Sequence, residues 1–147
     1  MISSFAFPTP ILHGPGAVSE LTGRLAELGA ERPLIVTDPG LLSTPAFVSL
    51  RGLLPKSVVF SGVHPNPVEA DVEAAAAAYW ENRCDSVIGF GGGSALDVAK
   101  IVRAGVASTI PRWSDLNVKD RPAPFAPFVA IPTTAGTGSE VGRSSVI

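Results

Sequence analysis

The sequence has little of several features that mark other classes of protein. It contains a single cysteine, Cys84, which excludes an internal disulfide framework and a cysteine-rich zinc site and favours a reducing compartment. Its 11 Lys and Arg residues are scattered and the net charge is −2, so nothing favours nucleic acid or an anionic membrane. No apolar run is long enough to span a membrane, and the first residues lack the basic start of a secretory signal. We therefore expect a cytoplasmic protein that binds neither nucleic acid nor membrane.

Apolar residues are abundant instead. They make up 46% of the 147 residues, charged residues make up 16%, and the mean hydropathy is +0.33. A chain of this length suits one domain with a substantial core. Because the composition is apolar even for such a domain, we expect part of its surface to pack against a partner, such as a second copy of the chain.

Strand and helix patterns alternate along the sequence. Short apolar runs typical of buried strands occur at residues 33–38, 56–60, 86–90 and 128–131. Helical patterns cover residues 17–28, 43–54, 68–82 and 94–107. A proline-rich connection occupies residues 109–127, and residues 144–147 have the pattern of a further strand. The alternation predicts an α/β fold with a mainly parallel sheet and helices on both faces.

Three consecutive glycines, Gly91, Gly92 and Gly93, stand between a predicted strand and a predicted helix. Glycine lets the backbone approach a ligand closely, and the first free N–H groups of a helix bind anions. The arrangement is typical of a phosphate-binding loop, to which Ser94 adds a hydroxyl. The alternative is a capping box, in which Ser94 and Asp97 satisfy the helix start without a ligand, although capping does not require three glycines.

The glycine loop matches neither common phosphate motif in full. The P-loop pattern fails because Lys100 comes too late and no Ser or Thr follows it. The dinucleotide pattern G-x-G-x-x-G begins at Gly89 but ends on Ser94. The acid expected about 20 residues later would be Asp115, which does not lie at a strand end. Asp38, at the end of LIVTD, is the better candidate.

Four segments of the sequence resemble one family, the iron-containing (group III) alcohol dehydrogenases. They are LIVTDPG at 34–40, FSGVHPNP at 60–67, GGGSALDVAK at 91–100 and IPTTAGTGSEV at 131–141. The last two are highly specific, and their order and spacing agree with the family. The resemblance covers essentially the whole chain but only the N-terminal part of a family member. It implies a Rossmann-like dinucleotide-binding domain over residues 1–147, with the family's helical, metal-binding C-terminal domain missing.

The resemblance also implies a role for the polar residues of these loops, with NAD, or NADP, as the cofactor. The three glycines, Ser94 and Asp97 would hold the pyrophosphate. Asp38 would meet the adenosine ribose, and Asn66 would lie toward the nicotinamide. Thr133, Thr134 and Thr137 would line the other flank, where hydroxyls and free amides can donate to phosphate and ribose oxygens. An ordinary polar turn is the alternative for this threonine loop, but its position directly after a buried strand favours the site.

The sequence departs from the family in two ways. Gly142 stands where members commonly carry Thr, so one cofactor hydroxyl is missing. Members bind their divalent metal through one Asp and three His of the C-terminal domain, whereas this chain has only His13 and His64. His13 is expected in a loop and His64 in a turn at the cleft edge, and neither matches a ligand position. Lys100 is expected to be a solvated helix end and Cys84 a small core residue.

The function implied by the resemblance is hydride transfer between an alcohol or aldehyde and NAD(P). In the complete enzyme the metal, iron by the family's description, would polarise the substrate oxygen. No catalytic residue or metal ligand is assigned within residues 1–147, so this chain alone is expected to be inactive, and the substrate alcohol is not predicted. The alternative is a stand-alone nucleotide-binding or interaction module without redox chemistry.

Overall fold

A parallel sheet of four strands forms the centre of the molecule. The computed structural model describes residues 2–6, 9–107, 124–142 and 144–147. The strands of this sheet are β3 (Pro33–Val36), β4 (Val58–Phe60), β5 (Ser86–Gly91) and β6 (Phe128–Pro132), in the order β4-β3-β5-β6. All three pairings are parallel, and every residue of β3 and β5 is buried. The four strands predicted from apolar runs are confirmed.

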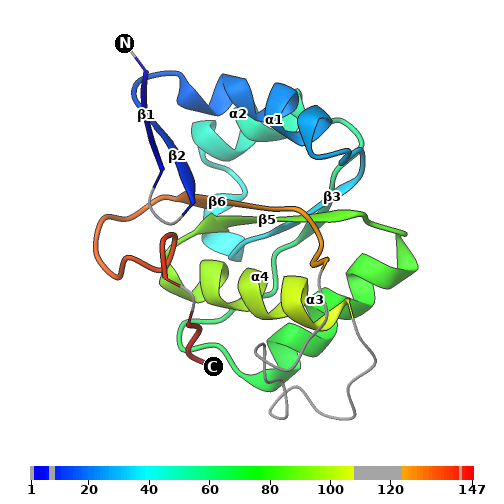
Figure 1. The fold of residues 1–147 in the computed structure, drawn as a ribbon. Coiled ribbons are helices and arrows are strands. Elements are labelled where there is room, and N and C mark those ends of the chain that lie inside the picture. The colour runs from blue at the N-terminus through cyan, green and yellow to red at the C-terminus, as the bar shows by residue number, and fades with distance from the viewer. Residues whose placement is uncertain (1, 7–8, 108–123, 143) are drawn as a thin grey trace.

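Helices cover both faces of this sheet (Figure 1). They are α1 (Leu21–Glu27), α2 (Pro45–Leu53), α3 (Glu69–Glu81) and α4 (Gly93–Gly105). Ile35 of β3 packs into a core with α1 and α2, while its neighbours Leu34 and Val36 pack into a second core with α3 and α4. Successive side chains of a strand point to opposite faces, so one strand supplies both cores. The predicted α/β architecture with helices on both faces is confirmed.

The helix boundaries follow local sequence signals. Thr44 caps α2, because its hydroxyl accepts a hydrogen bond from the amide of Phe47 at 3.3 Å, and proline follows in the first turn. The helix predicted over residues 17–28 is divided into a 3₁₀ turn, Ala17–Glu20, and α1. Gly29, with φ of 69°, ends α1 in the left-handed conformation that favours glycine.

The N-terminal residues form a hairpin that the sequence did not predict. β1 (Ser3–Ala6) and β2 (Pro10–His13) pair antiparallel in a sheet of their own. The expectation of a loop at His13 is therefore wrong, since His13 ends β2. Strands of four residues that lie outside the central sheet carry no long apolar or alternating pattern by which to recognise them.

The C-terminal part differs from the sequence prediction in one respect. Residues 144–147, expected as a strand, form none. The amide of Val146 donates instead to the side chain of Asp97 on α4, at 3.1 Å, so a side chain takes the place of a strand partner. Most of the connection predicted at 109–127, including Trp113, lies outside the described residues.

The chain changes direction within the sheet between β3 and β5. From β3 it runs through α2 to β4 at one edge; from there it returns through α3 to β5 and continues through α4 to β6. The first crossover packs on one face and the later ones on the other. The loops that follow β3 and β5 therefore leave the sheet toward opposite faces. They open a crevice at the carboxyl ends of these two strands, which is the position where doubly wound sheets bind ligands.

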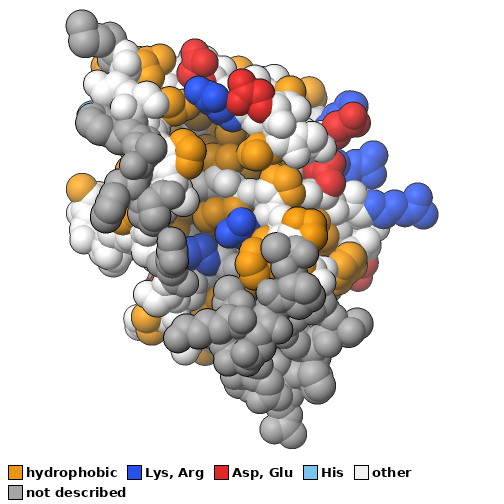
Figure 2. Space-filling view, in the orientation of Figure 1, with side chains coloured by type: hydrophobic (Ala, Val, Ile, Leu, Met, Phe, Trp, Pro, Cys, Tyr) orange, Lys and Arg blue, Asp and Glu red, His pale blue; other side chains and the backbone are white. Residues whose placement is uncertain are grey.

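Hydrophobic side chains gather along one edge of this sheet. Figure 2 shows them across the middle of the face on which Figure 1 places β6. Among the described residues β6 has a partner strand on one side only, and Phe128, Val129, Ala130 and Ile131 are partly buried. A half-covered apolar edge agrees with the expectation of a packing partner, which stays a prediction.

Candidate functional site

The three glycines form a tight cradle between β5 and α4. Gly91 ends β5 with φ of 150°, Gly92 is the N-cap of α4 and Gly93 is its first residue. A Cβ atom at Gly91 would lie 2.8 Å from the Cβ of Ala95, closer than side-chain carbons approach. A Cβ at Gly93 would lie 3.0 Å from Oγ1 of Thr137. Glycine is therefore required at Gly91 by both the backbone conformation and close packing, and at Gly93 by close packing.

The capping-box alternative is wrong. Ser94 is the second residue of α4 and not its N-cap, and the N-cap Gly92 has no side chain with which to bond the helix amides. The amide of Leu96 bonds to the carbonyl of Gly92 at 3.1 Å, as the ordinary helical pattern requires. The amides before it belong to the first turn, which lacks carbonyl partners within a helix and attracts anions. The helix start is thus open to a phosphate.

Asp38 lies beside Gly91, just past the carboxyl end of the neighbouring strand β3. Its Oδ1 accepts a hydrogen bond from the amide of Gly40 at 3.0 Å and so caps the 3₁₀ turn Pro39–Leu41. Its Oδ2 would lie 3.5 Å from a Cβ at Gly91, which places the second oxygen beside the cradle. Asp38 is therefore a turn residue. It also places a carboxylate near the ends of the strands where ligands bind in such sheets, as its sequence position predicted.

The threonine loop after β6 contacts the same cradle. The amide of Thr133 donates to the carbonyl of Gly91 at 3.0 Å. Oγ1 of Thr134 would lie 3.5 Å from a Cβ at Gly92, and Oγ1 of Thr137 would lie 3.0 Å from a Cβ at Gly93. The three predicted threonines thus lie next to the three glycines. Because their loop is largely exposed, their hydroxyls are accessible to a ligand.

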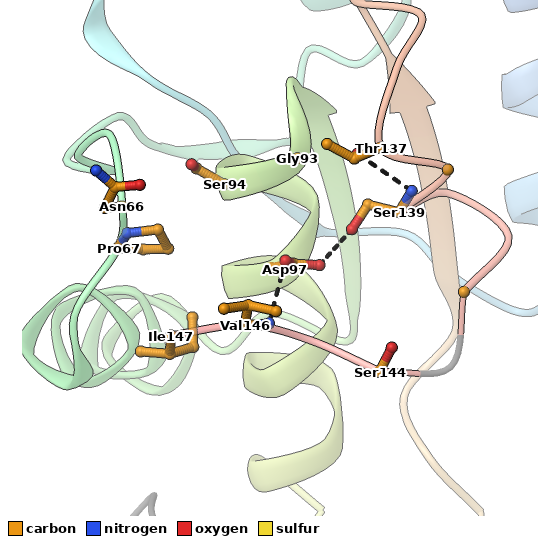
Figure 3. Close-up of a pocket in the computed structure, with 12 residues that line it drawn as sticks. Asn66, Pro67, Gly93, Ser94, Asp97, Thr137, Ser139, Ser144, Val146 and Ile147 are labelled. Carbon is orange, nitrogen blue, oxygen red and sulfur yellow. Dashed lines mark hydrogen bonds between the residues drawn. The ribbon is translucent and has the colours of Figure 1, made fainter.

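A cavity of about 380 Å³ opens beside the start of α4 (Figure 3). Five of the predicted residues line it: Asn66, Gly93, Ser94, Asp97 and Thr137. The other five, Asp38, Gly91, Gly92, Thr133 and Thr134, do not line it but extend the same surface over the ends of β3, β5 and β6. The structure therefore brings the predicted residues together along one edge of the sheet.

Asn66 enters this cavity from the loop before α3. It has a φ of 53°, the left-handed region that Asn tolerates better than most side chains. Pro67 lines the cavity next to it. His64, expected at the cleft edge, is not among the lining residues and contacts Asp71 of α3 instead.

Sequence reasoning missed several lining residues. They are Pro67, Gly138, Ser139, Ser144, Val146 and Ile147; Gly142, which also lines the cavity, was named only as a position that lacks a cofactor hydroxyl. Ser139 stands within the motif IPTTAGTGSEV, so the motif itself was the signal that could have found it. Nothing in the local pattern of residues 144–147 indicates that they return to α4.

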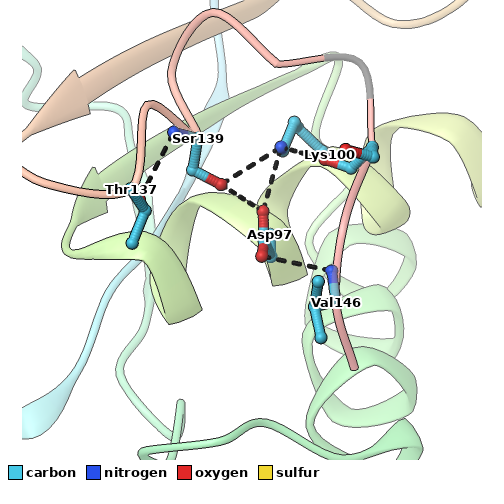
Figure 4. A network of polar contacts seen from close by, with 6 residues as sticks. Asp97, Lys100, Thr137, Ser139 and Val146 are labelled. Atoms are coloured by element: carbon cyan, nitrogen blue, oxygen red, sulfur yellow. Dashed lines mark hydrogen bonds and ion pairs between the residues drawn. The ribbon is translucent and has the colours of Figure 1, made fainter.

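Asp97 and Lys100 form the centre of a polar network (Figure 4). Nζ of Lys100 lies 2.9 Å from Oδ1 of Asp97 and 3.2 Å from Oγ of Ser139, and both charged side chains are only 13% exposed. Ser139 donates its hydroxyl proton to Asp97, and Lys100 also donates to the carbonyl of Ser144. The prediction of a solvated Lys100 is wrong, because the i, i+3 spacing sets it beside Asp97 and the threonine loop covers both.

The remaining titratable candidates do not form a metal centre. Within the part of the chain that the structure describes, no three His, Cys, Asp or Glu side chains come together. Burial, followed by the nearby Asp85, raises the pKa of the Cys84 thiol to about 11, so the thiol is unreactive near neutral pH. The prediction of Cys84 as a buried core residue is confirmed. No described helix is long and apolar enough to cross a membrane.

The fold and site together define a class: a doubly wound, Rossmann-like α/β domain with a glycine cradle at its switch point. The family model described as iron-containing alcohol dehydrogenase matches residues 8–147. The chain belongs to this family.

Three related proteins illustrate the similarity. Choline dehydrogenase of Bacillus subtilis (strain 168) is 37% identical over 98% of this chain and 38% of its own length. The NAD-dependent methanol dehydrogenase of Bacillus methanolicus is 35% identical over 99% of this chain and 39% of its own length. A crystal structure of sulfoacetaldehyde reductase from Bifidobacterium kashiwanohense in complex with NAD+ matches 87% of this chain and 35% of its own, with 31% identity and a TM-score of 0.77. This chain therefore spans less than half the length of these relatives.

Proposed function

We propose that residues 1–147 form the dinucleotide-binding domain of a dehydrogenase that transfers hydride between an alcohol or aldehyde and NAD. The observation that carries the proposal is the cradle itself. Side chains at Gly91 and Gly93 would collide with Ala95 and Thr137, and the start of α4 has no side-chain cap. A site of this geometry suits the pyrophosphate of a dinucleotide.

The pyrophosphate is proposed to lie over the first turn of α4. The backbone amides of Gly93 and Ser94, the Ser94 hydroxyl and the helix dipole would hold it. Thr134 and Thr137, beside the same glycines, would donate from the opposite side. Asp97, predicted as a further ligand, already has partners of its own, so we expect its contribution to be indirect.

Asp38 is proposed to accept hydrogen bonds from the adenosine ribose. Its Oδ1 already bonds the amide of Gly40, whereas its Oδ2 lies on the side of the cradle. A carboxylate in this place favours the free 2′-hydroxyl of NAD and repels the 2′-phosphate of NADP. NAD is therefore the expected cofactor, in agreement with two of the relatives, the NAD-dependent methanol dehydrogenase and the sulfoacetaldehyde reductase in complex with NAD+.

The nicotinamide half is proposed to lie toward Asn66 and the cavity. Bound nicotinamide supplies the chemistry, since it accepts or returns the hydride. The Asn66 amide can donate to and accept from the ligand, and the left-handed backbone holds it at the cavity wall. Pro67 and Ile147 add apolar surface against which a ring can pack.

The substrate and the metal belong to the proposal for the complete protein. The named substrates of the relatives differ, namely choline, methanol and sulfoacetaldehyde, while the same domain is shared. The shared domain therefore favours an alcohol or aldehyde without choosing one. The described residues offer no cluster that fits iron, so no metal ligand is proposed among them. That this chain alone has no turnover stays a prediction.

The proposal is tested by titrating the purified chain with NADH and following nicotinamide fluorescence. Gly93→Ala introduces a Cβ 3.0 Å from Thr137 and is expected to weaken binding by about tenfold or more. The matched control is Gly52→Ala in α2, where a Cβ meets nothing within 4 Å and binding should be unchanged. A folded wild-type chain without saturable NADH binding would overturn the proposal.

The same titration separates dehydrogenase from a stand-alone nucleotide module. If AMP or ADP competes fully but NADH binds no more tightly than ADP, the nicotinamide half contributes nothing and the module is favoured. Tighter binding of NADH than of ADP, lost in Asn66→Ala, supports the dehydrogenase. Circular dichroism of each variant checks that the fold is retained.

A further inference from the structure

We propose that Asp97 and Lys100 are positioning residues: together they hold the backbone of residues 144–147 as one wall of the cavity. The two side chains make hydrogen bonds of opposite direction to the backbone of this segment. Asp97 accepts from the amide of Val146 at 3.1 Å, and Lys100 donates to the carbonyl of Ser144. One side chain thus takes a backbone donor and the other a backbone acceptor of the same segment. We call this pair the clamp.

The clamp is joined to the threonine loop by Ser139. Its hydroxyl donates to Asp97 and accepts from Lys100, and its amide donates to Oγ1 of Thr137 at 3.3 Å. Thr137 in turn lies beside Gly93. Two segments that follow β6 are therefore fastened to the same two residues of α4, and both line the cavity (Figures 3 and 4).

The partners of Asp97 argue against direct contact with phosphate. Ser139 and Lys100 meet its Oδ1 and Val146 meets its Oδ2, so three of its roughly four acceptor sites are occupied. A carboxylate has no donor for a phosphate oxygen and repels it. Lys100 offsets that charge at 2.9 Å, which leaves the amides of the helix start as the anion-binding groups.

Among the described residues, the segment 144–147 is held by its hydrogen bonds to the clamp. The structure assigns it no strand, and Val146 is 75% exposed. The Val146 amide therefore reports on the clamp directly, since its recorded partner is Asp97. The identity of the bound molecule rests on the proposed function, whereas the clamp itself does not.

The experiment combines amide hydrogen exchange with ligand binding on the 147-residue chain. Exchange at the Val146 amide is measured by nuclear magnetic resonance for the wild type, Lys100→Met, Asp97→Asn and Ser139→Ala. The control variant is Lys56→Met, which removes an exposed lysine that is paired with Glu31 at 3.8 Å and does not line the cavity. The amide of Ala30, bonded to Leu25 at 2.8 Å, is the internal reference for global stability.

The clamp predicts faster exchange at Val146, by about tenfold, in Lys100→Met and in Asp97→Asn, with the Ala30 amide unchanged. NADH affinity should fall in the same variants by several-fold, and Lys56→Met should match the wild type in both measurements. Unchanged exchange at Val146 in both variants overturns the clamp. So does a loss of NADH affinity without a change in exchange, because that result makes the two residues direct ligands.

The double variant Asp97→Ala/Lys100→Met separates position from charge. It restores the charge balance that each single variant disturbs, but it removes both contacts to residues 144–147. Positioning predicts that exchange stays fast and affinity stays low, whereas recovery of affinity would show that charge balance alone matters and would overturn the proposal.

If a single variant unfolds, Ser139→Ala, which leaves both charges in place, is expected to speed exchange at Val146 to a smaller extent, and no change there counts against the clamp. A wild type that does not bind NADH refutes the proposed function, while the exchange result still decides the clamp.

Discussion

Nδ1 of His64 lies 2.8 Å from Oδ1 of Asp71, and this contact joins the loop that carries Asn66 to the first turn of α3. Asp71 also accepts hydrogen bonds from the backbone amides of His64 at 3.4 Å and Val68 at 3.3 Å. Val68 is the N-cap of α3 but has no side-chain oxygen with which to cap the helix. Asp71, in the first turn, instead accepts the hydrogen bond from the backbone amide of Val68. One buried carboxylate thereby fixes both ends of the loop around Asn66.

Replacing Asp71 by Asn is expected to lower the free energy of unfolding by about 1–3 kcal/mol, because three donors lose a carboxylate acceptor. Urea unfolding near neutral pH measures this change. Glu73→Gln, an exposed acid on the same helix, is the control and should be within about 0.5 kcal/mol of the wild type. An Asp71→Asn variant as stable as the wild type would contradict the assigned role.

The same residue makes stability depend on pH. Burial alone would raise the pKa of Asp71, but hydrogen bonds from His64 and Val68 outweigh burial and hold the pKa below its ordinary value of 3.8. The unfolded chain therefore takes up this proton at a higher pH than the folded chain. The stabilisation is fully present above about pH 4 and is lost as the pH falls through the lowered pKa. Unfolding curves below about pH 4 should show a smaller pH slope in Asp71→Asn than in the wild type.

The hydroxyl of Thr37 provides a second prediction. Thr37 is 0% exposed, and its Oγ1 has no hydrogen-bond partner among the described residues. Thr37→Val keeps the shape and removes the unsatisfied group, so it is expected to leave the free energy of unfolding unchanged or to raise it by about 1 kcal/mol. Thr44→Ala, which removes the cap of α2, should lower it by about 1 kcal/mol instead. A clear loss of stability in Thr37→Val would show that its hydroxyl has a partner.

Cofactor preference provides a third prediction. Asp38→Asn removes the charge but keeps an oxygen for the amide of Gly40, whereas Asp38→Ala removes both. The wild type is expected to bind NADH about tenfold or more tightly than NADPH, and both variants should lose most of this preference. Retention of the preference in Asp38→Asn would assign the residue to the turn alone.

Self-association is the fourth prediction. Strand β6 is half-buried and, among the described residues, has a partner strand on one side only. Together with exposed apolar residues such as Trp80 and Val48, 58% and 61% exposed, it favours a second copy as partner. Sedimentation velocity over a wide concentration range should show a dimer or larger species. Val48→Lys on α2, at a residue that is 61% exposed, should shift the distribution toward monomer, and Lys56→Met should not. A monomer at the highest concentration would refute the prediction.

The central sheet was predictable because β3 and β5 are buried on both faces and therefore appear as apolar runs. The hairpin β1–β2 was not, because its short strands lie outside that sheet. The positions of the glycines and threonines directly after strands were predictable from the apolar runs before them and from the resemblance of their motifs to the family. Lys100 was misjudged because its burial depends on the loop after β6, whose position no local pattern records.

The contacts of residues 144–147 with α4 close long loops in the chain. Val146 and Asp97 are 49 residues apart, and Ser144 and Lys100 are 44 apart. Such non-local contacts can open while the sheet, with its two apolar cores, stays folded. The free energy of local opening includes only the interactions that are broken locally, and it can be smaller than the free energy of global unfolding. Circular dichroism and heat or urea melts report on that sheet. Binding competence and global stability are consequently separate quantities in this molecule, and a variant with an unchanged melting temperature can still have lost its cavity wall.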